Sequence, residues 1–129
     1  MKCWKYEVMP RFPARFYGKV VAKGWALVDT GAKYCVIHPD IASILAVEFE
    51  REEILYGFGS KEPIKVEITS LKVEVDEFMD EVEVACIDKE LYPDKAPKMV
   101  IGMSFIRRFS IMLTGNEVCI EGKEKVTTC

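Results

Sequence analysis

Histidine and metal-ligand spacings are the scarcest features of this sequence. Its 129 residues contain one histidine, His38, and five cysteines, no two of which form a Cys-x-x-Cys pair. The sequence therefore offers few residues for a Cys/His zinc site or for a Cys–His nucleophile pair. We expect neither a metal nor a cofactor. The cysteine count is odd, and we expect the chain in a reducing compartment. We therefore expect the cysteines to act as small buried hydrophobic residues, most clearly Cys35 and Cys119.

Long apolar runs are also missing. Half of the residues are hydrophobic, yet every run is far too short to span a bilayer. The N-terminus, MKCWKYEVMP, lacks the continuous apolar segment of a secretory signal. We therefore expect a cytoplasmic protein with no membrane partner. The net charge of −3, with the acidic excess concentrated in residues 41–94, disfavours a nucleic-acid partner.

Strand patterns dominate what is present. Apolar residues alternate with charged ones along residues 64–75 and 82–86, with the likeliest turn at residues 76–81, which predicts half-buried antiparallel strands. Residues 18–31 predict two strands or one bent hairpin around Gly24. Residues 109–122 predict a strand, a turn at residues 114–116 and a second strand.

Two short segments have the features of helices. Pro39 stands at the start of one, with Ile41, Ile44 and Leu45 at helical spacing. Residues 104–109 predict one or two turns that bury Phe105, Ile106 and Phe109. The length of the chain predicts one domain, residues 1–129. The fold class is therefore all-β or nearly so, with one or two short helices.

Three motifs follow one another along the chain. Residues 26–37, ALVDTGAKYCVI, place Asp29-Thr30-Gly31 directly after an apolar strand. By itself this tripeptide is compatible with an ordinary turn, because Asp and Gly are common turn residues. Residues 57–60, GFGS, then put an aromatic residue between two glycines. Residues 99–109, MVIGMSFIRRF, lead from apolar residues through Gly102 into a helical turn.

In this order the motifs resemble those of the retroviral-type, or retropepsin-like, aspartic proteases, and they cover most of residues 20–110. The resemblance implies a single-domain acid protease barrel that hydrolyses peptide bonds. Asp29 would be catalytic. Thr30 would hydrogen-bond across a dimer, and Gly31 would let the backbone pass close to the carboxylates.

The number of catalytic aspartates implies a dimer. The mechanism of this family needs two carboxylates that share one proton, because like charges about 3 Å apart cannot both ionise. The chain contains one Asp-Thr-Gly, and the Thr-Gly at residues 114–115 has no aspartate before it. The resemblance therefore implies a homodimer with one Asp29 from each chain.

The same resemblance implies a set of residues that contact a peptide or protein substrate. Residues 57–59 would lie at or near the tip of a flap, and Val100 and Ile101 would line the floor of the site. The expected substrate-binding residues are Ala32, Lys33, Val36, Gly57, Phe58, Gly59, Val100 and Ile101.

Two departures from the family pattern leave alternatives open. Lys33 stands where viral enzymes have an acid, and a cation near Asp29 would favour the ionised carboxylate. This motivates a non-catalytic retropepsin-like module that binds peptides or mediates assembly.

The pair Met103-Ser104 is expected to weaken the link between the helix and the catalytic loop. A small oligonucleotide-binding β-barrel is a third reading, which the acidic charge disfavours.

Overall fold

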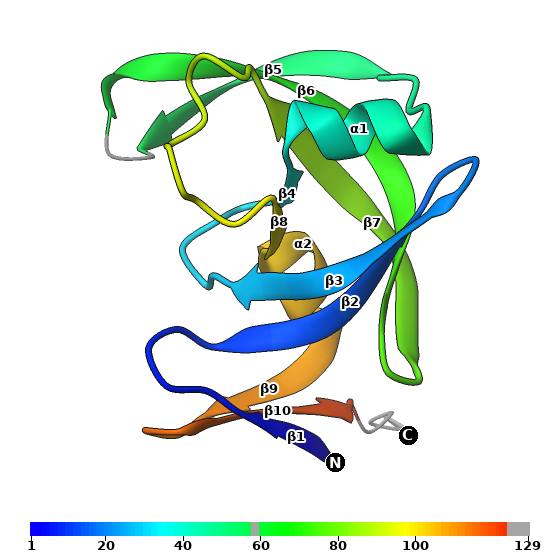
Figure 1. Ribbon diagram of the computed structural model, residues 1–129, viewed down its shortest axis with the longest axis vertical. Helices are drawn as coiled ribbons and strands as arrows, with labels where there is room; N and C mark the ends of the chain where they lie inside the picture. The colour runs from blue at the N-terminus through cyan, green and yellow to red at the C-terminus, as the bar shows by residue number, and fades with distance from the viewer. Residues whose placement is uncertain (58–59, 124–129) are drawn as a thin grey trace, which may run out of the picture.

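The computed structural model describes residues 1–57 and 60–123, and Figure 1 shows the arrangement of its elements. The chain forms mostly strands, with two short helices between them. In order they are β1 (Lys2–Lys5), β2 (Arg11–Tyr17), β3 (Val21–Val28), β4 (Cys35–Ile37), α1 (Pro39–Leu45), β5 (Arg51–Gly57), β6 (Ser60–Val75), β7 (Phe78–Ile87), β8 (Met99–Ile101), α2 (Met103–Ile106), β9 (Phe109–Leu113) and β10 (Glu117–Gly122).

Six strands close into a barrel. The strand order is β2-β3-β8-β4-β7-β6-β5, and β2 also pairs with β6, which completes the ring. β5 lies outside this ring and, among the described residues, pairs only with β6, so its second edge is open there. The sequence-based prediction of an all-β barrel with one or two short helices is confirmed.

The short strand β8 brings together two segments that are far apart in the sequence. β8 pairs in parallel with the end of β3, where Val28 lies opposite Ile101, and antiparallel with β4, where Val36 lies opposite Val100. Because β3 and β8 run in the same direction, the residues that follow both strands emerge side by side. Asp29 and Gly102 are those residues.

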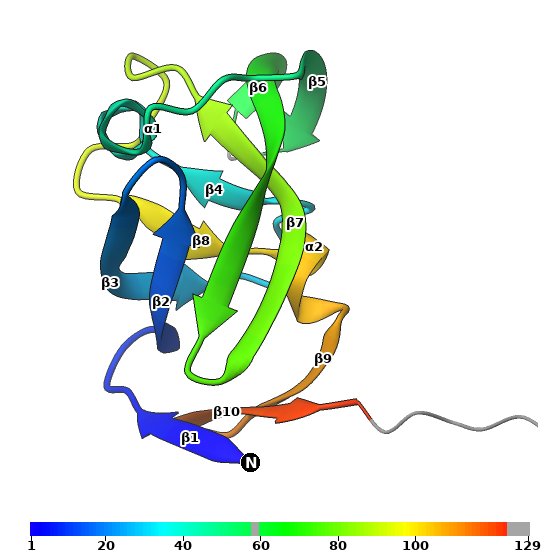
Figure 2. The same cartoon turned by 90° about the vertical axis from the view of Figure 1, so that its right-hand side faces the viewer.

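The long hairpin of β6 and β7 contributes to two hydrophobic clusters. In β6 the buried residues are Ile64, Val66 and Ile68 and then, after a change of phase, Leu71, Val73 and Val75. The first three pack with Val36 and Tyr34, and the last three pack in the main core. Figure 2 shows this long hairpin crossing the face of the molecule and twisting along its length. Opposite faces of β6 are buried in its two halves. The predicted strands of this region are confirmed, but the turn occupies only residues 76–77 of the predicted 76–81, because residues 78–81 belong to β7.

The expectation of two strands or a bent hairpin around Gly24 is wrong. Residues 21–28 form one continuous strand, and its hairpin partner is β2, with the turn at residues 18–20. A Cβ at residue 24 would lie 2.8 Å from Cε of Met99. Gly24 therefore serves close packing against another side chain, which the sequence alone does not distinguish from a turn.

Both predicted helices form, with one difference in length. α1 begins at Pro39, and Nδ1 of His38 accepts a hydrogen bond from the Asp40 N–H at 3.0 Å, which caps the helix. α2 ends at Ile106, before the predicted end at residue 109. Phe105 and Ile106 are buried as predicted, whereas Phe109 begins β9 and is half-buried.

A second sheet lies below the barrel in Figure 1 and has the order β1-β10-β9. Cys3 and Cys119 lie opposite each other in this sheet and form a disulfide. Cys119 is buried as predicted, but the expectation that it acts as a simple buried hydrophobic residue is wrong, because strand register places it against another cysteine. Cys35 is a free buried thiol, as predicted. Within the described residues, no helix has the length and apolar character needed to cross a membrane.

Candidate active site

Asp29 directly follows β3 and is fixed by three hydrogen bonds with backbone groups. Its N–H donates to the carbonyl of Ile101 at 2.9 Å, which continues the β3–β8 pairing. The Gly31 N–H donates to Asp29 Oδ1 at 2.9 Å, and the Ala32 N–H donates to the Asp29 carbonyl at 3.3 Å. The carboxylate is therefore held by the loop that follows it, while Thr30 and Gly31 remain exposed.

Gly102 supports this loop from below. A Cβ at residue 102 would lie 2.0 Å from the carbonyl oxygen of Tyr34 and 2.9 Å from that of Ala32. No side chain fits between these backbones, so the close approach requires glycine. The Met103 N–H then donates to the Ala32 carbonyl at 2.7 Å, which joins the start of α2 to the loop.

Ser104 makes a second link between α2 and the strands beside the loop. Its hydroxyl accepts a hydrogen bond from the Cys35 N–H at 3.0 Å and donates one to the Glu83 carbonyl at 2.7 Å. Ser104 is buried, with 2% of its surface exposed. The expected weakening of this link is therefore wrong, because a serine hydroxyl is both donor and acceptor and satisfies two backbone groups at once.

A groove of about 440 Å³ opens between the Asp29 loop and β5. The loop lies opposite the hairpin of β5 and β6, as the cyan and green segments of Figure 1 show. The loop supplies an acid, small residues and a cation to this groove, whereas β5 supplies one acid and three largely apolar side chains. The lining residues are Asp29, Gly31, Ala32, Lys33, Glu53, Ile54, Leu55 and Tyr56.

Among the described residues, the other predicted substrate-binding residues lie outside the set that lines this groove. Val36 is buried against the second core cluster and Ile101 is buried in the main core, whereas Val100 is half-buried. Gly57 ends β5 and pairs with Ser60. Phe58 and Gly59 lie outside the described residues. Contact of these six residues with a substrate stays a prediction.

Glu53 is a groove residue that the sequence did not reveal. Its carboxylate accepts a hydrogen bond from the Tyr34 hydroxyl at 2.5 Å and lies 3.1 Å from Nζ of Lys33. Arg51 lies 3.5 Å from the same carboxylate. The Tyr34 hydrogen bond and then the Lys33 ammonium hold the pKa of Glu53 below its ordinary value. The opposite charges of Lys33 and Glu53 were the sequence signal that could have revealed this contact. The sequence alone does not show that the fold brings the two residues together.

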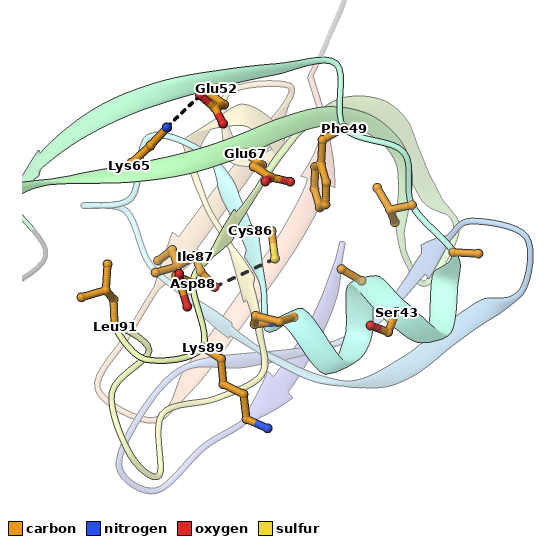
Figure 3. Close-up of a pocket in the computed structure, with 14 residues that line it drawn as sticks. Ser43, Phe49, Glu52, Lys65, Glu67, Cys86, Ile87, Asp88, Lys89 and Leu91 are labelled. Carbon is orange, nitrogen blue, oxygen red and sulfur yellow. Dashed lines mark hydrogen bonds and ion pairs between the residues drawn. The ribbon is translucent and has the colours of Figure 1, made fainter.

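A larger cavity, of about 630 Å³, lies between α1 and the strands β5 to β7 (Figure 3). None of the predicted catalytic or substrate-binding residues that the structure describes lines it. Figure 3 shows the Cys86 thiol there beside Glu67 and Asp88. Burial and these two carboxylates raise the pKa of Cys86 to about 11, which keeps the sulfur protonated and a poor nucleophile. We therefore place the candidate site at the smaller groove, which Asp29 lines.

Potential metal ligands come together at one place in the described residues. Cys3, Glu117 and Cys119 have ligand atoms within 4.8 Å of one another. The two sulfur atoms are joined to each other in the disulfide, so neither is a thiolate that could bind a metal.

Comparison with known proteins places the fold. No protein-family model and no curated relative matches this chain. Among solved structures, the chain is similar to the crystal structure of a retropepsin-like aspartic protease from Rickettsia conorii, with a TM-score of 0.59 and 14% sequence identity. The match covers 92% of this chain and 91% of that one. At this identity the likeness establishes the fold, and the chain therefore has the fold of a retropepsin-like aspartic protease.

Proposed function

We propose that this protein is an aspartic endopeptidase that acts as a homodimer. The observation that carries the proposal is the position of Asp29. Its carboxylate is held by its own loop, at the mouth of a groove bounded by an open-edged strand, in a fold shared with a retropepsin-like protease. The proposed catalytic residues are Asp29, Thr30 and Gly31 of each chain.

The proposed reaction uses a water molecule and two aspartates. One Asp29 carboxylate accepts a proton from the water as it attacks the scissile carbonyl. The other Asp29, protonated, donates a hydrogen bond to the carbonyl oxygen as negative charge develops there. As the C–N bond breaks, the first Asp29 gives the proton that it took from water to the leaving amine, while the other Asp29 keeps its own, so that the pair again holds one proton.

The second carboxylate must come from another chain. Glu53 is the other acid that lines the described groove, but it is already engaged by Tyr34 and Lys33. Both contacts favour its ionised form and lower its pKa, so it is unsuited to sharing a proton. A single chain therefore supplies half of the site, and we propose that a second copy supplies the rest.

The open edge of β5 suggests how a peptide would bind. An extended peptide can pair with an exposed strand edge through backbone hydrogen bonds, while its alternate side chains fill pockets. Ile54 and Tyr56 on β5 are 57% and 80% exposed and border the groove. We propose an apolar peptide segment as the substrate, contacted also by the predicted residues Ala32 and Lys33.

The contacts of Lys33 favour catalysis over a non-catalytic peptide-binding module. That alternative depended on an ammonium group that would stabilise the ionised form of Asp29. In the structure, Nζ of Lys33 contacts Glu53 and lies 5.1 Å from the centre of the Tyr34 ring. Its charge is therefore balanced by a carboxylate of β5.

Replacement of the aspartate tests the proposal. We expect Asp29→Asn to reduce peptide cleavage by more than about a thousandfold, because an amide can neither accept the proton of water nor share one. The measurement is hydrolysis of a peptide library at mildly acidic pH, where the pair retains one proton. Sedimentation of the wild type should give the mass of a dimer.

Asp76→Asn is the matched control, because it makes the same chemical change at the turn between β6 and β7. Residue 76 has φ = 54°, a conformation that asparagine also accepts. This variant should cleave like the wild type. Undiminished hydrolysis by Asp29→Asn, or a strictly monomeric wild type, would refute the proposed function.

A further inference from the structure

Glu53 connects the hairpin of β5 and β6 to the loop that holds Asp29. Lys33 and Tyr34 follow Gly31 closely in the sequence, and both bind the carboxylate of Glu53 from across the groove. Tyr34 is 5% exposed and packs in the second core cluster, so its hydroxyl is presented from a fixed position. The acidic side chain of β5 is therefore bound to a rigid part of the Asp29 loop.

The contacts extend beyond the groove. Arg51, two residues before Glu53 on the same strand, contacts both Glu53 and Glu83 of β7. The charged and titratable groups around Glu53 come from three segments. They are Asp29, Lys33 and Tyr34 of the loop, Arg51 of β5 and Glu83 of β7. Three donors and two carboxylates, those of Glu53 and Glu83, join three segments that are distant in the sequence.

We propose that Glu53 is a positioning residue of the active site, which anchors β5 to the Asp29 loop and neutralises Lys33. This inference rests on the proposed function for its effect on catalysis, whereas the anchoring is a property of the chain alone. The pKa of Glu53 lies below its ordinary value, so the carboxylate stays ionised at the mildly acidic pH that favours a shared proton between the aspartates. The contact is lost only at still lower pH.

The sign of the electrostatic effect follows from the two charges. Removing the carboxylate of Glu53 leaves the Lys33 ammonium unbalanced beside the groove, which favours the fully ionised pair of Asp29 residues. The shared proton is then lost at lower pH. Removing the ammonium instead leaves Glu53 unbalanced and shifts the loss to higher pH.

The test compares pH–rate profiles of kcat/KM for peptide cleavage. In Glu53→Gln we expect the alkaline limb to move down by about half a pH unit, a modest shift because solvent and salt screen these exposed groups. Lys33→Met should move it up, and the double variant should return it toward that of the wild type. An alkaline limb that does not move in Glu53→Gln would overturn the electrostatic role.

Glu52→Gln is the matched control. Glu52 is the preceding residue of β5, pairs with Lys65 and lines the larger cavity rather than the Asp29 groove. The change removes the same charge from the same strand, so we expect the profile of the wild type. A shift as large as that of Glu53→Gln would show a general effect of net charge and would overturn the specific assignment.

A second measurement does not depend on activity. Amide hydrogen exchange of β5 should be about tenfold faster in Glu53→Gln than in Glu52→Gln, because one charge-assisted hydrogen bond to Tyr34 is weakened. Faster exchange in a protein that cleaves no peptide would refute the proposed function and retain the anchor. Equal exchange in the two variants would overturn the anchor, whatever the activity.

Discussion

Gly102 shows how one residue controls the position of the Asp29 loop. The backbones of residues 32, 34 and 102 approach so closely that the α-hydrogen of glycine occupies the space of a side chain. The hydrogen bond from Met103 to Ala32 depends on this approach. The Asp29 loop is thus positioned by a residue that has no side chain.

We expect Gly102→Ala to lower the free energy of unfolding by about 3 kcal/mol, because its Cβ would meet backbone atoms that have no freedom to move away. Urea denaturation measures the change. Gly115→Ala is the control, since a Cβ there meets nothing within 4 Å. Equal stability of the two variants would contradict the packing argument.

At the scale of elements, the helix α2 has one turn and depends on its contacts rather than on helix propensity. Helices this short are unstable in isolation, and tertiary packing must hold them in place. Phe105 and Ile106 bury its apolar face, while Ser104 joins it to β4 and β7. The same serine therefore joins the helix to β4, the strand that follows the Asp29 loop.

Ser104→Ala should destabilise the protein by about 1 to 3 kcal/mol, because the buried N–H of Cys35 loses its acceptor. Thermal or urea unfolding gives the value. Ser110→Ala, at an exposed position of β9, is the matched control and should stay within about 0.5 kcal/mol of the wild type. A neutral Ser104→Ala would show that the hydroxyl is dispensable for the link.

Across the whole molecule, the disulfide between Cys3 and Cys119 joins strands from the two ends of the sequence. Its sequence separation is 116 residues. A cross-link that closes so long a loop restricts the unfolded chain strongly. It also fixes β1 on β10, the central strand of the small sheet. The two strands form four residue pairs, one of which is Cys3 and Cys119.

We expect Cys3→Ser to lower the free energy of unfolding by about 3 to 5 kcal/mol, chiefly through the freedom regained by the unfolded chain. Urea denaturation with and without reductant checks this. Reductant should destabilise the wild type and leave the variant unchanged. A wild type that is insensitive to reductant would mean that this disulfide contributes little.

Much of this architecture was predictable because its signals are local. Alternation of apolar and charged residues predicted β6 and β7, and Pro39 predicted the start of α1. The prediction at Gly24 was wrong, because a glycine that packs against a distant methionine cannot be distinguished in the sequence from one that makes a turn. The position of Ser104 was likewise misjudged, because its partners lie 69 and 21 residues away.

The sequence by itself determined the strand-rich class, the place of Asp29 directly after a strand and the presence of a single Asp-Thr-Gly motif. Periodicity, turn chemistry and a residue count suffice for these. Only the tertiary structure decided that Lys33 meets Glu53, that Cys3 meets Cys119 and that β5 borders the groove. Such pairings depend on strand order and register, which bring together residues that no local pattern relates.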